Sequence, residues 1–366
     1  MKKFILIGLI FFFFFPAISF AQEQSSMSSQ VATTYTRGKV IEIKQSSEEN
    51  KSIVQSIKLT ITEGEKKGTV VETTNTFSQD DTEGKLFIGD EVILIEEERQ
   101  GSISYVVSDH YRVNTLYFIM AFFFILVIIM AGRKGLGSIV GLGISIAVLL
   151  FYVVPQILSG ADPLLTSISG ALVIMFSTIY LAHGFSRQTT VALVGTFLAL
   201  IITGVLAVFM ASILNLSGTG SEDAYMLQLS GIDIDLQGLL LGGIIIGALG
   251  VLDDITTAQS AAIFALADAN EKLTTKQLAK KGLKIGKEHI TSLVNTLVLA
   301  YAGASLPIFL FFVINPLNQP WWVILNYPMI IEEIVRTLAG SFGLILAVPI
   351  TTILAAFFAR YNIKIS

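Results

Sequence analysis

The sequence predicts an α-helical multi-pass membrane protein with seven transmembrane helices and a small all-β domain in front of them. Composition is the first reason, because 53% of the 366 residues are hydrophobic and 14% are charged, whereas soluble domains carry about 25% charged residues. The second is a series of apolar runs after residue 115, each near the length of about 20 residues that crosses a bilayer. The third is a polar stretch before them in which apolar residues alternate with a period of two.

The charge balance and the cysteine count exclude several classes of protein. A net charge of −4 gives no reason to expect nucleic acid as a partner, since a basic face is its usual footprint. The absence of cysteine excludes disulfides, thiolate metal sites and cysteine nucleophiles. We expect neither a cofactor nor a metal, because the sequence carries no motif for either.

The amino terminus has the pattern of a secretory signal peptide over residues 1–21. Two lysines precede an apolar run at 4–15, and Ser19 and Ala21 supply the small residues that signal peptidase requires. Cleavage after Ala21 is expected, and an uncleaved signal anchor is the alternative. Both place the polar linker that follows, 22–34, outside the cytoplasm.

Residues 35–112 are predicted to form an extracytoplasmic β domain of the OB or SH3-like kind. Runs rich in Val, Ile and Thr are separated by turns that contain glycine. Between residues 31 and 110, 15 acidic side chains stand against 9 basic ones, which argues against nucleic acid as the ligand. A spacer or a partner-docking module is expected. The predicted strands are 35–44, 52–62, 68–77, 91–98 and 102–109.

Seven apolar runs are predicted to build the membrane domain, residues 115–360. Lys and Arg fall in alternate connections and in the tail, 361–366, so the positive-inside rule places the amino terminus outside and the carboxyl terminus inside. The signal peptide requires the same orientation. The predicted spans are 116–131, 138–158, 163–182, 189–214, a fifth that begins at 238, 289–314 and 331–359.

The longest cytoplasmic connection, 268–288, carries six lysines among Leu273, Leu278, Leu283 and Ile285. This pattern is typical of an amphipathic helix on the inner leaflet, where anionic lipid attracts each cation by about 1 kcal/mol. An ordinary positively charged loop is the alternative.

The fifth span holds two adjacent carboxylates, Asp253 and Asp254. One helix over 238–267 would be about 45 Å long, against a hydrocarbon core of about 30 Å, so the helix must break or leave the membrane. We expect one half to end near Asp253 and a second half to be capped by Asp254 or Thr256, as in broken transporter helices. An intramembrane Asp costs about 2.5 to 3.5 kcal/mol and is functional by default; the alternative is a pair that caps a short helix at the interface. The neighbouring polar residues predicted for the same site are Thr256, Thr257 and Gln259.

The last two spans add further candidates for this solute- or ion-binding site. Asn295 is one, although pairing with a polar group on a neighbouring helix is its commoner role. Glu332 and Glu333 lie one turn before Arg336, and these spacings predict one structural ion pair that leaves one carboxylate for the site.

Three blocks of the chain resemble the YibE/F family of bacterial multi-pass membrane proteins. They are GALGVLDDITTAQ at 247–259, HITS at 289–292 with NTL at 295–297 and AYAG at 300–303, and EIVRTL at 333–338. The resemblance implies a location in the bacterial cell membrane. It also implies a second YibE/F-type subunit as a partner, because such proteins often occur in pairs, and it implies no established biochemical activity.

These features predict a permease, or one permease subunit, for a small solute or ion, with the Asp pair at its centre. The alternative is a non-transporting scaffold or sensor whose β domain binds a cell-envelope partner. No catalytic residue is predicted. An intramembrane aspartyl hydrolase is disfavoured because adjacent residues on one helix point about 100° apart.

Overall fold

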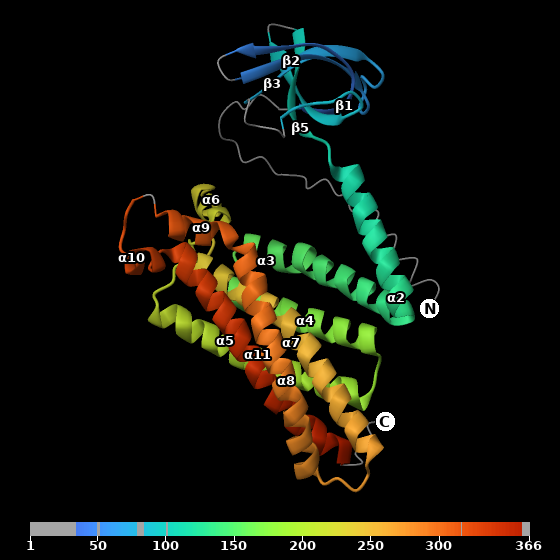
Figure 1. Ribbon diagram of the computed structural model, residues 1–366, viewed down its shortest axis with the longest axis vertical. Helices are drawn as coiled ribbons and strands as arrows, with labels where there is room; N and C mark the ends of the chain where they lie inside the picture. The colour runs from blue at the N-terminus through green and yellow to red at the C-terminus, as the bar shows by residue number, and fades with distance from the viewer. Residues whose placement is uncertain (1–33, 50–51, 79–83, 100–101, 316, 361–366) are drawn as a thin grey trace. The chain divides into compact units, whose positions relative to one another are not determined.

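The computed structural model describes residues 34–49, 52–78, 84–99, 102–315 and 317–360. It divides into two compact units, with the division falling near residue 127 inside the first long helix. One unit contains the β domain and the other contains the helical bundle (Figure 1). The predicted signal peptide, the linker up to residue 33 and the carboxyl-terminal tail lie outside the described residues.

Five antiparallel strands form a barrel-like sheet in the β domain, which confirms the five predicted strands. Their order is β3-β2-β1-β4-β5, so β4 returns to lie beside β1 as in a Greek key, the arrangement of partly open OB barrels. Alternate side chains such as Ile57 and Leu59 on β2 and Val92 and Leu94 on β4 build the core. The strands are β1 (Thr34–Glu49), β2 (Ser52–Ile61), β3 (Val70–Ser78), β4 (Glu91–Arg99) and β5 (Ser102–His110).

Helices make up the rest of the described chain. Five are long and apolar enough to cross a membrane, and a bent pair, α8 with α9, adds a sixth. The helices are α2 (Val113–Val148), η2 (Leu149–Val153), α3 (Val154–Leu158), α4 (Pro163–His183), α5 (Arg187–Ile213), α6 (Glu222–Leu229), α7 (Leu236–Ala269), α8 (Thr275–Ala304), α9 (Leu306–Ile314), α10 (Trp321–Leu325) and α11 (Pro328–Arg360).

The number of long helices differs from the seven predicted spans because α2, η2 and α3 form one run of 46 residues. This run contains both of the first two predicted spans. Between them, Gly132 has a non-helical backbone with φ 56° and ψ −131°, which kinks α2. A positive φ of this kind is readily adopted by glycine.

α7 occupies the centre of the bundle, where α4, α5, α8 and α11 pack against it (Figure 1). Its buried Leu252 and Ile255 share a core cluster with Ala199 of α5 and Ala347 of α11. Small residues on these neighbours let helix backbones approach closely, as is usual in membrane bundles.

The expected break in α7 is absent. The helix is continuous over 34 residues, about 51 Å at about 1.5 Å per residue, so it extends past a core of about 30 Å even when it is tilted. Thr256 does not cap a second half, because its hydroxyl donates to the carbonyl of Asp253 at 3.2 Å. Thr257 does the same at 2.8 Å, which is how threonine is accommodated within a helix.

The break lies in the sixth predicted span instead. α8 and α9 meet at an angle of 67° around Ser305. Pro307, in the first turn of α9, has no backbone N–H to continue the hydrogen bonds of α8.

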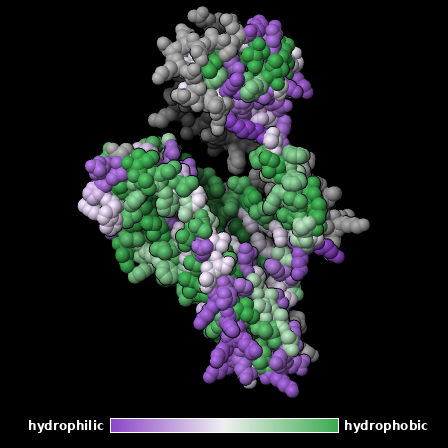
Figure 2. Space-filling view, viewed as in Figure 1, coloured by the Kyte–Doolittle hydropathy of each residue, from purple (hydrophilic) through white to green (hydrophobic). Residues whose placement is uncertain are grey.

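Most of the lysine-rich connection, residues 275–288, is an amphipathic helix, as the pattern predicts. It forms the start of α8, which begins with a capping box between Thr274 and Gln277. Its apolar face is buried in the bundle, where Leu278 packs with Ile263 of α7 and Ala355 of α11. Figure 2 shows hydrophilic residues gathered over this end of the bundle. The exposed lysines are Lys276, Lys280, Lys281, Lys284 and Lys287.

Candidate functional site

Asp253 lies where α7 packs against α4. Its Oδ2 accepts a hydrogen bond from Oγ1 of Thr178 at 3.4 Å. Its Oδ1 is buried and has no hydrogen-bond partner among the described residues. Because a buried acceptor without a donor is costly, this oxygen is suited to a proton, a water molecule or a cation.

Asp254 points about 100° away from Asp253 around the helix and is exposed. His183, in the last turn of α4, interacts electrostatically with it. Thr178 lies about 8 Å from His183 along α4. The two carboxylates therefore lie within about two turns of the end of α4, close to its connection with α5.

One face of α7, called here the glycine face, is exposed and almost free of side chains. A Cβ added at Gly243 would lie 3.7 Å from Nη1 of Arg336, and one at Gly247 would lie 3.5 Å from Oη of Tyr301. The face therefore has Arg336 and Tyr301 at one end and Asp254 at the other. Its exposed residues are Gly243, Gly247, Gly250, Asp254 and Ala258.

Thr256 and Gln259 are fully buried and join α7 to its neighbours. Oγ1 of Thr256 lies 2.5 Å from Oγ1 of Thr196 on α5. Nε2 of Gln259 donates to the carbonyl of Gly282 on α8 at 2.9 Å and to Oγ1 of Thr352 on α11 at 2.7 Å. These are polar contacts between helices of the kind that stabilise membrane bundles.

Glu332 and Glu333 have different surroundings. Glu332 is only 5% exposed, and its carboxylate accepts the backbone N–H groups of Gly218 at 3.0 Å and Gly220 at 3.1 Å. Glu333 pairs with Arg336, with 3.3 Å between Oε2 and Nε. The carboxylate left over from the ion pair therefore anchors the connection between α5 and α6.

Asn295 is not brought to the Asp pair. It is exposed on α8, about 200° around the helix from Leu297, which is buried against the bundle. The structure thus groups Asp253, Asp254 and Thr257 on one stretch of α7 and places Asn295 on an outer surface.

Several residues at the site are absent from the sequence prediction. Thr178 and His183 lie on α4 and Tyr301 lies on α8. The sequence around each of them contains no pattern that predicts a contact with α7. The loop that binds Glu332 does carry a signal, because Gly218 and Gly220 alternate with Ser217 and Thr219. Such a run exposes backbone N–H groups to an anion.

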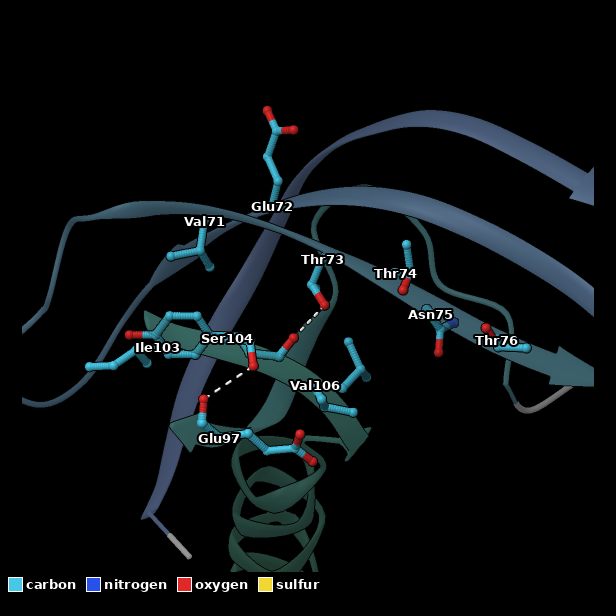
Figure 3. Close-up of a pocket in the computed structure, with 12 residues that line it drawn as sticks. Val71, Glu72, Thr73, Thr74, Asn75, Thr76, Glu97, Ile103, Ser104 and Val106 are labelled. Atoms are coloured by element: carbon cyan, nitrogen blue, oxygen red, sulfur yellow. Dashed lines mark hydrogen bonds between the residues drawn. The ribbon is translucent and has the colours of Figure 1, made fainter. Parts of the chain in front are cut away.

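The β domain has a groove of its own between the edge strands β3 and β5, with a volume of about 770 Å³ (Figure 3). The hydroxyl of Thr73 donates across it to the carbonyl of Tyr105. The exposed side chains of Ile103 and Val106 add apolar surface. Across the described parts of both units, no group of three or more His, Asp or Glu residues is placed to hold a metal ion.

The helices and the strands together define a class: a membrane protein with an apolar helical bundle and an amino-terminal β module. Comparison with known families matches residues 119–361 to the YibE/F-like proteins. This match covers more than half of the chain, so the chain belongs to the YibE/F-like family. The match begins inside α2 and leaves out the β domain. No curated protein and no solved structure matches.

Proposed function

We propose that this membrane protein moves a small solute or ion along the glycine face of α7 and past Asp253 and Asp254, alone or as one subunit of a permease. The observation that carries the proposal is the buried, unpartnered Oδ1 of Asp253 beside a second, exposed carboxylate. Ionisable groups at membrane depth are expensive and normally functional. Two adjacent carboxylates favour a cation or a proton as the group that binds there.

The bend between α8 and α9 supports the same proposal. Transporters commonly bind their substrates where a span is interrupted, because the interruption exposes backbone polar groups. Tyr301 lies about one turn before the bend at Ser305 and approaches Gly247 on the glycine face. The route would therefore run from this bend to Asp254.

The predicted site residues take different roles in this proposal. Asp253, Asp254 and Thr257 line the route, and Glu333 stands at its outer end with Arg336. The packing roles fall to Thr256, Gln259 and Glu332. No catalytic role is proposed, since Asp253 is directed to α4 while Asp254 is exposed.

We further propose seven crossings, with the amino terminus and the β domain outside the cytoplasm. The kink at Gly132 supports two crossings within α2 to α3. Arg360 donates to the carbonyls of Ala267 at 3.4 Å and Asn270 at 2.7 Å, so the ends of α7 and α11 meet beside the lysines of α8. The positive-inside rule assigns this end to the cytoplasm.

Uptake into vesicles tests transport. The full chain is reconstituted alone and with a second YibE/F-type subunit, and uptake of protons, monovalent and divalent cations and small organic ions is compared with empty vesicles. We expect uptake above background for at least one of them, and lower uptake for Asp253→Asn and Asp254→Asn. Asp233→Asn, at an exposed position before α7, is the matched control. Background uptake throughout the panel would contradict transport.

A scaffold or sensor is the second candidate, and the groove between β3 and β5 favours it. The edge of a sheet presents unpaired backbone groups on which a partner's strand can pair. Deleting residues 35–112 should then abolish crosslinking to a cell-envelope partner, while the two Asn variants behave as wild type. The transport proposal instead predicts that the Asn variants lose uptake and that the deletion of residues 35–112 does not abolish it.

A further inference from the structure

The outer surface of α8 carries a row of exposed residues that is called here the α8 seam. Its members recur at alternating spacings of four and three residues, which places them on one side of a helix, as in the contact line of a coiled coil. The other side of α8 packs on the bundle through Gly286 and Leu297. The members of the seam are Lys284, Glu288, Thr291, Asn295 and Val298.

The middle of the α8 seam belongs to a candidate membrane span, because α8 and α9 together are long and apolar enough to cross a bilayer. Gln259 donates to the carbonyl of Gly282, and the next residue, Ser260, donates to the carbonyl of Gln188 at 2.8 Å. Gly282 is therefore level with the start of α5. Asn295 is about 20 Å farther along α8, inside a hydrocarbon core of about 30 Å.

Thr291 and Asn295 of the seam keep hydrogen-bonding capacity that no described residue uses. The Asn295 side chain makes no hydrogen bond to any described residue. The Thr291 hydroxyl donates to the carbonyl of Lys287 at 3.0 Å and keeps its acceptor lone pairs free. Lipid tails offer neither donors nor acceptors, so an amide that faced them alone would be unfavourable.

We propose that the α8 seam is the interface with a second copy of this chain, in which the Asn295 side chains of the two copies face one another. A two-fold interface brings the same patch of both copies together, so its groups must complement themselves. An amide does so because it carries both donors and an acceptor. A single Asn in such a seam is a known determinant of register and of two-chain assembly.

The charged end of the seam fits the same partner. Lys284 and Glu288 lie one turn apart and are exposed, so the lysine of each copy can approach the glutamate of the other. Val298, at the opposite end, supplies apolar contact. The inference concerns assembly and holds whether or not the protein transports a solute.

Disulfide trapping tests the interface, because the chain has no native cysteine. Single cysteines at Thr291, Asn295 and Val298 should give covalent dimers after mild oxidation in membranes. Ala300→Cys is the matched control, since Ala300 is exposed at nearly the same depth but lies on another side of the helix. Monomer at all three seam positions, equal trapping at Ala300, or crosslinks only to a different protein would overturn the proposal.

A second variant tests the role of the amide itself. Asn295→Leu should raise the dissociation constant of the dimer by roughly 3- to 30-fold, the range for a polar contact between membrane helices. Ala300→Leu should leave it unchanged. Because Asn295 lies outside the packing of the bundle, the thermal unfolding of the diluted monomer should not change. An unaltered dissociation constant would contradict the amide pairing.

Discussion

Oγ1 of Thr178 on α4 donates to Oδ2 of Asp253 on α7 across 3.4 Å. This is the hydrogen bond that the Asp253 carboxylate receives from the described part of the chain, and it is long. Its other oxygen is buried without a partner. The fold therefore positions the carboxylate but leaves much of its hydrogen-bonding capacity unused. Such a group is suited to bind and release a small ligand.

Thr178→Val removes this donor with little change in side-chain volume. We expect the free energy of unfolding to fall by less than about 1 kcal/mol, because the bond is long and an ordinary hydrogen bond contributes about 0.5 to 1.5 kcal/mol. Uptake should change, since the carboxylate loses its donor. Ser177→Ala is the control, because Ser177 donates to carbonyls of its own helix. Wild-type uptake in the Thr178 variant would count against a role for this contact.

Glu332→Gln tests the anchor between α11 and the α5–α6 connection. The amide keeps one acceptor and turns an NH2 group toward a backbone N–H. We therefore expect a loss of about 1.5 to 3 kcal/mol of stability, the range for a hydrogen bond to a charged group. Hydrogen exchange at the amides of Gly218 and Gly220 should accelerate. Glu333→Gln should leave those two amides protected, and equal exchange in both variants would refute the assignment.

Gly286→Ala tests the contact between α8 and α11. The new Cβ would collide with Cγ1 of Val348 and lie 3.1 Å from Nε2 of Gln259. Overpacking of this kind costs about 1 to 3 kcal/mol, which thermal unfolding would detect.

Two further variants control this experiment. Val348→Ala should restore part of the stability of Gly286→Ala by making room for the methyl group. Gly303→Ala should cost nothing, because nothing lies within 4 Å of its Cβ position. A Gly286→Ala chain as stable as wild type would show that the helices are not in contact there.

The ion pair between Arg37 and Glu63 predicts how the stability of the β domain depends on pH. The hydrogen bond from Arg37 lowers the pKa of Glu63 below its ordinary value. A lowered pKa in the folded state means that the pair stabilises the domain above the ordinary Glu pKa, and that this contribution is lost as the pH falls through the lowered pKa.

Glu63→Gln removes that contribution and leaves the Arg37 guanidinium over the ring of Tyr111, at 4.5 Å. We expect the variant to be slightly less stable than wild type at pH 7 and equally stable in strong acid. The difference should be small because the Glu63 side chain is exposed and that of Arg37 is partly exposed. Hydrogen exchange of β1 and β4 amides, corrected for its intrinsic pH dependence, would measure it. A difference that persists unchanged in acid would contradict the pair.

Local patterns account for what the sequence predicts well. The five strands follow from period-two alternation between turns and appear close to their predicted bounds. The apolar runs also predict α4, α5 and α11 closely. The continuity of α7 does not follow from such patterns. Asp253 and Thr256 favour a helix end locally, but buried contacts such as that of Thr256 with Thr196 hold the helix intact.

The contacts that define the candidate site could not be predicted, because their partners are distant in sequence. Thr178 and Asp253 are 75 positions apart, and Gly218 and Glu332 are 114 apart. No periodicity links such pairs. Charge beside apolar runs draws attention to Asp253 and Glu332 in the sequence, but only packing shows that the first carboxylate has one long hydrogen bond and that the second anchors a loop.

Solute uptake by Asp254→Asn, measured beside Asp233→Asn in the same vesicles, tests the central claim most directly. Asp254 is exposed on the glycine face, so its loss should leave the fold intact while removing a charge from the route. The proposal predicts uptake near that of empty vesicles for Asp254→Asn and wild-type uptake for Asp233→Asn. Equal, wild-type uptake by both variants would contradict a route past the Asp pair.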